Sequence, residues 1–87
     1  MKAVVTVVGK DKSGIIASVT SFLSERGLNV EDISQTVLQD WFAMIMLVET
    51  GSVQIGELRD GLVAHGKEIG VEISVAHEDI FTAMHRI

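Results

Sequence analysis

Residues 42–48, Phe-Ala-Met-Ile-Met-Leu-Val, are apolar at every position. The side chains of a strand alternate between the two faces of its sheet, so a run without polar positions predicts a strand that is buried on both faces. Residues 3–8, Ala-Val-Val-Thr-Val-Val, have nearly the same character and are rich in β-branched residues, which favour strands. These two stretches therefore predict the two central strands of one sheet.

Two further strand-like stretches are more polar and predict the edges of that sheet. Residues 29–39 carry several polar side chains, and Val30 and Ile33 fall out of step with a two-residue period, which predicts a β-bulge. Residues 71–76 alternate between valine or isoleucine and polar or small residues. That alternation is typical of a half-buried edge strand.

Two helices fill the gaps between these strands. Apolar residues recur at helical spacing after Gly14 and again over residues 55–69, and Gly27 and Gly70 end the two runs. Leu23 and Leu28 stand at the positions whose contact accompanies a Schellman cap around Gly27. The expected N-caps are side chains with a hydrogen-bonding oxygen: Ser13 or Asp11 for the first helix and Ser52 for the second.

Residues 78–87 place Ile80, Phe81, Met84 and Ile87 at helical spacing, which predicts a C-terminal helix. The whole order is then βαββαβ plus this helix, an α+β ferredoxin-like sandwich with an antiparallel sheet in the order 4-1-3-2. Residues 1–77 form the domain, and residues 78–87 pack on its sheet or on a partner subunit. Because the two other helices cover only one apolar face of the sheet, we predict a homodimer or a higher homo-oligomer.

The composition excludes several classes of function. Eighty-seven residues make one domain, and the net charge of −5 with scattered lysines and arginines argues against direct binding of nucleic acid. The chain has no cysteine, hence no disulfide and no thiol nucleophile. Its longest apolar run is too short to cross a bilayer, so we expect a cytoplasmic protein without membrane contact.

The loop from Gly9 to Gly14 has the glycine spacing of a phosphate-binding P-loop, but Ile15 and Ile16 stand where that motif needs Lys and Ser or Thr. Nucleotide binding by this motif is thus rejected. The loop still leads into a helix N-terminus, whose free N–H groups favour a carboxylate or phosphate. A plain turn with a glycine for fit explains the spacing equally well.

Neither a metal site nor a catalytic group is evident in the sequence. His65, His77 and His85 lack the spacing of metal ligands. Serines 13, 18, 21, 24 and 34 have no histidine nearby in the sequence and do not lie in a nucleophile-elbow motif. We therefore predict no enzyme activity, no metal and no cofactor.

Gly56, Gly61 and Gly66 stand inside the second helix, where each costs about 0.5–1 kcal/mol relative to alanine. Close approach of the helix to the sheet or to the other helix is one reason for them. A helix that tightens on ligand binding is the other.

Residues 11–17, Asp-Lys-Ser-Gly-Ile-Ile-Ala, followed by residues 27–33, Gly-Leu-Asn-Val-Glu-Asp-Ile, resemble the signature of ACT domains over essentially the whole chain. Lys12 and Ser13 replace the Arg and Pro that this signature often has. The ending Glu-Asp-Ile-Phe at residues 78–81, with Met84, His85 and Ile87, resembles a bacterial family of small stand-alone ACT proteins of unassigned function.

This resemblance implies a regulatory module that binds an amino acid at an interface between two copies. Its positions imply that the loop from Asp11 to Gly14 binds the carboxylate and that Asp32 or Gln35 of a neighbouring subunit binds the ammonium. The full set of implied ligand-binding residues is Asp11, Lys12, Ser13, Gly14, Ile15, Asn29, Asp32 and Gln35.

The alternative is a dimerisation and protein-interaction module without a ligand, which docks a regulated partner through the polar second strand or the C-terminal helix. The resemblance also extends to glycine-cleavage repressor-like proteins, which would imply an indirect role in gene regulation.

Overall fold

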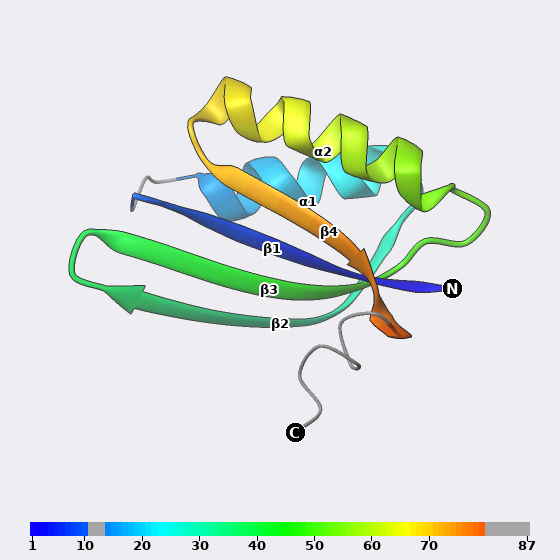
Figure 1. Cartoon of the computed structure of the whole chain (residues 1–87), viewed down its shortest axis with the longest axis horizontal. Coiled ribbons are helices and arrows are strands. Elements are labelled where there is room, and N and C mark those ends of the chain that lie inside the picture. Colours follow the sequence, from blue (N-terminus) through cyan, green and yellow to red (C-terminus); the bar gives the residue numbers. More distant parts are fainter. Residues whose placement is uncertain (11–13, 80–87) are drawn as a thin grey trace.

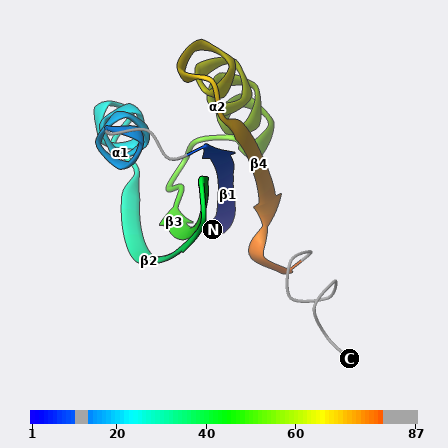
Figure 2. The ribbon, with the colours of Figure 1, turned by 90° about the vertical axis from the view of Figure 1, so that its left-hand side faces the viewer.

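The computed structural model describes residues 1–10 and 14–79. Their elements follow the order β1 (Lys2–Lys10), α1 (Ile15–Glu25), β2 (Asn29–Leu38), β3 (Trp41–Glu49), α2 (Ile55–Ile69) and β4 (Glu72–His77). The strands form one antiparallel sheet in the order β2-β3-β1-β4, and both helices lie on the same face of it (Figures 1 and 2). The predicted ferredoxin-like order 4-1-3-2 is confirmed, whereas the predicted C-terminal helix lies largely outside the described residues.

The core lies between the two helices and the inner face of β1 and β3. These central strands pair in full register, from Lys2 opposite Glu49 to Lys10 opposite Trp41. Alternate side chains of both strands point at the helices and are buried. They are Ala3, Val5 and Val7 of β1, and Phe42, Met44, Met46 and Val48 of β3. The two doubly apolar stretches therefore occupy the central places that the sequence predicts. Their other face is only partly buried, since Val8 is 40% exposed and Ile45 is 43% exposed.

The end of α1 is a Schellman cap, as the sequence predicts. Gly27 has a φ of 73°, in the left-handed region. The Leu28 N–H donates to the Leu23 carbonyl at 3.0 Å, and the Gly27 N–H donates to the Ser24 carbonyl at 3.0 Å.

Both predicted N-caps are wrong. Gly14, with a φ of 88°, is the N-cap of α1, because its carbonyl accepts the first helical hydrogen bond from the Ser18 N–H. Gln54 is the N-cap of α2, and among the residues that the structure describes no side chain forms a capping bond to either helix. Before α2, the Val53 N–H donates to the Thr50 carbonyl in a turn, so the helix begins later than a cap at Ser52 would require.

Strand β2 is the exposed edge of the sheet. The predicted bulge is present as a shift in its pairing with β3 between Val30 and Asp32. From Glu31 to Leu38 every residue of β2 is exposed. Figure 2 shows the reason, because β2 curves away from the layer of helices at the side of the sheet opposite β4.

Two of the three glycines in α2 are explained by close approach. A Cβ atom at Gly66 would lie 2.8 Å from the carbonyl oxygen of Val71, and one at Gly61 would lie 3.0 Å from the Phe22 ring. A Cβ atom at Gly56 would meet nothing within 4 Å. The first two glycines therefore let α2 pack against the start of β4 and against α1.

We predict that Gly66→Ala destabilises the protein by about 1–3 kcal/mol, because the backbone oxygen of Val71 cannot move aside as a flexible side chain could. Gly56→Ala is the matched control. It should leave the free energy of unfolding unchanged or raise it by up to about 1 kcal/mol. Urea denaturation of both variants checks this, and equal stabilities would show that α2 does not need its close approach to β4.

The N-terminus is tied to the end of β3. The amino group of Met1 lies 2.9 Å from Oε1 of Glu49, which also accepts a hydrogen bond from the Gly51 N–H at 3.2 Å. These two donors, the amine foremost, lower the pKa of Glu49 below its ordinary value of 4.5. The Met1 carbonyl in turn accepts from the Thr50 N–H and hydroxyl.

Because its pKa is lowered, ionised Glu49 stabilises the fold at pH values above the ordinary pKa of a glutamate. This stabilisation is lost as the pH falls through the lowered pKa. We predict that Glu49→Gln is less stable than the unmodified protein at pH 7 and that the difference shrinks towards pH 3. Denaturation across this range measures it. Glu72→Gln removes an exposed carboxylate of β4 and is the control: its stability should change with pH as that of the unmodified protein does. If Glu49→Gln also shows the pH dependence of the unmodified protein, the ion pair does not form.

Candidate functional site

The site residues that the resemblance implies fall into two groups. Asp11, Lys12 and Ser13 lie outside the described residues. Gly14 is exposed at the start of α1, and the side chain of Ile15 behind it is buried in the core. Asn29, Asp32 and Gln35 are all exposed along β2.

The pairing of the strands places these two groups at different positions along the sheet. Asn29 pairs with Glu49, which pairs with Lys2 at the beginning of β1. The loop towards Gly14 instead follows Lys10, at the opposite end of β1. The eight residue steps between Lys2 and Lys10, at about 3.3 Å each, separate the two levels by roughly 26 Å. Within one chain, Asn29 and Gly14 are therefore not brought together.

The other two residues of β2 lie between these levels and on different faces. Asp32 pairs with Leu47, and its Oδ1 accepts a hydrogen bond from the Ile33 N–H at 2.9 Å. Gln35 pairs with the buried Met44 and so shares the face on which the helices lie.

A hollow of about 540 Å³ lies beside the end of β1. Lys10 of β1 and Lys67 of α2 both line it, together with the half-exposed ring of Trp41. Glu72 supplies a carboxylate on the β4 side. The two ammonium groups give this end of the sheet, next to the loop towards Gly14, a positive charge that attracts anionic groups.

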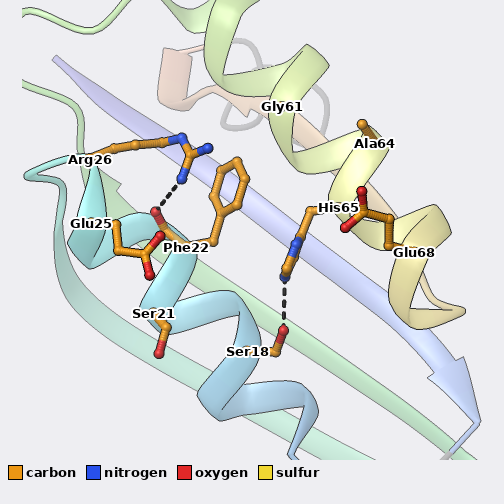
Figure 3. A pocket seen from close by; sticks show the side chains of 9 residues that line it. All are labelled: Ser18, Ser21, Phe22, Glu25, Arg26, Gly61, Ala64, His65 and Glu68. Carbon is orange, nitrogen blue, oxygen red and sulfur yellow. Dashed lines mark hydrogen bonds between the residues drawn. The ribbon is translucent and has the colours of Figure 1, made fainter.

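A second hollow, of about 550 Å³, lies between α1 and α2 (Figure 3). Here Ser18 Oγ and His65 Nε2 are 2.8 Å apart and share a hydrogen bond that links the two helices. The two residues are 47 positions apart in the sequence. Sequence reasoning missed this contact, because only the helical spacing of each segment is visible in the chain and not the face that each helix turns towards the other.

The ring of Phe22 lies between Arg26 and His65 in this groove. The guanidinium of Arg26 stacks 3.4 Å from the centre of the ring, and its Nη1 donates to the Phe22 carbonyl at 3.0 Å. The imidazole of His65 lies on α2 with its centroid 5.0 Å from that of the phenyl ring. Figure 3 shows the three side chains in a row across the groove.

Ser18 and His65 have the contact of a nucleophile and its base, but not the rest of such a site. In a catalytic triad a third group orients the histidine. Over residues 1–10 and 14–79, no carboxylate is hydrogen-bonded to His65. We therefore describe the pair as a link between the helices and as part of the groove.

The described part of the chain gathers no three His, Asp or Glu residues that could hold a metal ion. Among the same residues, neither helix is long and apolar enough to cross a membrane.

Comparisons with known proteins agree with this architecture. The family model described as "ACT domain" matches residues 2–76. A UPF0237 protein of Methanopyrus kandleri is 52% identical over 88 residues, which cover 99% of this chain and 98% of the relative. Relatives of the same name occur in several other archaea and bacteria.

Solved structures show the same fold. An ACT domain protein from Streptococcus pneumoniae superposes with a TM-score of 0.85 at 46% identity, over 93% of each chain. The regulatory subunit of aspartate kinase from Thermus thermophilus gives a TM-score of 0.70 at 30% identity, over 87% of this chain and 50% of that one. This chain belongs to the ACT domain family, in its UPF0237 group.

Proposed function

We propose that the protein is a ligand-responsive regulatory module that binds an amino acid between two copies of the chain. ACT domains are generally regulatory modules that bind small molecules, and one similar structure is a regulatory subunit of aspartate kinase. The observation that carries the proposal is the separation of Asn29 from Gly14 within one chain. The implied site is incomplete in one chain and needs a second copy.

The free edge of β2 offers a way for the second copy to join. Residues 33–38, Ile-Ser-Gln-Thr-Val-Leu, contain no charge and no proline. Val37 is 58% exposed and Leu38 is 71% exposed. Proteins usually protect an edge strand with lysine or proline, because its unpaired N–H and C=O groups are a template for another strand. Residues 33–38 lack that protection, whereas the bulge and the charges of Glu31 and Asp32 lie at the start of the strand.

The other edge of the sheet is less open. Strand β4 has six residues and packs beside α2, and Arg59 Nε donates to the Val75 carbonyl at 3.1 Å. Figure 1 shows α2 lying along β4, whereas no helix lies along β2. The second copy therefore pairs through β2.

Antiparallel pairing of two β2 strands about a two-fold axis reverses the direction of the second copy. The start of the partner's strand then lies beside the end of this one. This carries Asn29 of the partner subunit towards the level of the loop after Lys10, which it cannot reach in its own chain. Each dimer has two such places.

Each group of an amino acid finds a complement in this arrangement. The N-terminus of α1 at Gly14 and the ammonium groups of Lys10 and Lys67 attract a carboxylate. The side chain of Asn29 of the partner subunit supplies both a donor and an acceptor. Asp32 or Gln35 of the partner subunit completes the site as acceptor for the ligand's ammonium group.

We predict that the double variant Thr36→Lys and Val37→Lys is monomeric, because two lysines on the edge of β2 repel their symmetry mates and must be desolvated for pairing. Light scattering on a sizing column at micromolar concentration measures the mass. Ser74→Lys, which places a lysine on the exposed face of β4, is the control and should remain dimeric. An unmodified protein that is monomeric at this concentration would contradict pairing through β2.

Asn29→Ala should abolish the binding of the amino acid and leave the dimer intact, because Asn29 has no part in the core. At a ligand concentration a hundred times Kd, binding stabilises the fold by about 2.7 kcal/mol, which raises the melting temperature by roughly ten degrees or more. Thermal unfolding with a panel of the twenty amino acids tests this.

Gln54→Ala removes another exposed amide and should keep the full shift in melting temperature. If Asn29→Ala also keeps it, the site is wrong. If no amino acid shifts the unmodified dimer, the protein is an interaction module without a ligand, and the partner that it docks becomes the question.

A further inference from the structure

We propose that the groove between α1 and α2 is a second binding site, which takes a small zwitterion such as a free amino acid within a single copy of the chain. It differs from the interface in its location, because none of its lining residues belongs to β2 or to the loop after β1. It needs no second copy. Its existence therefore does not depend on the proposed dimer.

The groove has the size and the fixed walls of a ligand site. Its volume of about 550 Å³ falls within the range of roughly 300–1,000 Å³ that is common for pockets binding small molecules. Small residues on α2, Gly61 and Ala64, line it opposite α1. The hydrogen bond between Ser18 and His65 joins the two walls and fixes the imidazole at one end.

Arg26 is held in place before any ligand arrives. Its guanidinium rests on the ring of Phe22 and uses one N–H on the carbonyl of that residue. An arginine has five N–H donors, so others remain for a ligand. Within the described ranges Arg26 forms no ion pair. A held and unpaired guanidinium is suited to a carboxylate, which it binds with two parallel hydrogen bonds.

Negative charge lines the same groove from both helices. Glu25 lies on α1, on the same side as Arg26, and Glu68 lies on α2 near His65 (Figure 3). Neither carboxylate forms an ion pair with any residue in the described part of the chain. Glu68 is therefore available for an ammonium group at the α2 side of the groove.

These charges select the class of ligand. A simple anion would meet two carboxylates, and a simple cation would meet Arg26, which already covers the face of Phe22. A zwitterion has a group for each of these charges. Its carboxylate lies at Arg26 with the hydroxyl of Ser21, and its ammonium lies at Glu68. The hydroxyl of Ser18 and the rings of Phe22 and His65 line the space between.

The test is a titration of the full-length protein, labelled with ¹⁵N, with each of the twenty amino acids. We expect amide shifts to cluster around Ser21 and Ala64, on the two walls of the groove. Arg26→Gln and Glu68→Gln keep the size of each side chain and remove its charge. Each should weaken this binding by roughly tenfold to a hundredfold. Asp60→Asn removes another exposed carboxylate of α2, one that does not line the groove, and this variant should bind as the unmodified protein does.

A second comparison tests the charge argument. For the amino acid that causes the largest shifts, its amide lacks the carboxylate charge and its N-acetyl form lacks the ammonium. Both derivatives should bind at least tenfold more weakly at the groove. If either binds equally well, the groove does not select a zwitterion and the proposal fails.

Asn29→Ala separates this site from the proposed interface. Groove shifts that persist in Asn29→Ala and weaken in Arg26→Gln support the second site. If Asn29→Ala loses all binding while Arg26→Gln and Glu68→Gln keep it, the groove proposal is overturned and the interface site stands. Shifts that appear nowhere near Ser21 and Ala64 with any amino acid also overturn it.

Discussion

The antiparallel pairing of β1 with β3 is the contact on which the remaining packing depends. It runs without interruption from Lys2 and Glu49 to Lys10 and Trp41 and places seven buried side chains in one apolar surface. Both helices pack on this surface through side chains such as Val19, Leu23 and Leu62, none of which is exposed. The position of the groove between the helices follows from this packing, and so does the difference between the edges, because α2 lies along β4 whereas most of β2 is left uncovered.

The parts of the fold that sequence patterns predict are those in which one local feature decides the outcome. The apolar runs predict the central strands because strands that are apolar on both faces are typical of the middle of a sheet, although Val8 and Ile45 on the face without helices are 40% and 43% exposed. Gly27 predicts the cap of α1 because few other residues adopt a left-handed conformation readily. The mismatch of Val30 and Ile33 predicts the bulge because the period of a strand is two residues.

The features that the sequence does not predict depend on how separate segments meet. Ser52 is a good N-cap by propensity, but the turn around Thr50, held by the carbonyl of Met1, delays the start of α2. The contact between Ser18 and His65 depends on the rotation of two helices about their axes, which local periodicity leaves open. The loop is a candidate anion site because it leads into a helix N-terminus, but Asn29 comes from resemblance alone, and only the register of the strands shows that it stands far from Gly14 in its own chain.

The difference between the two edges of the sheet limits how large an assembly can grow. A sheet with two open edges can add copies on both sides and extend into a filament, whereas a sheet with one open edge can accept a single neighbour. Strand β4 is short and lies beside α2, so only β2 has a long unprotected edge. If two copies pair through β2, neither has a second open edge to which a third copy could add, and the assembly stops at a dimer. The uncharged stretch of β2, residues 33–38, would be an aggregation hazard in a protein open on both sides, and in the proposed dimer it is a self-limiting contact.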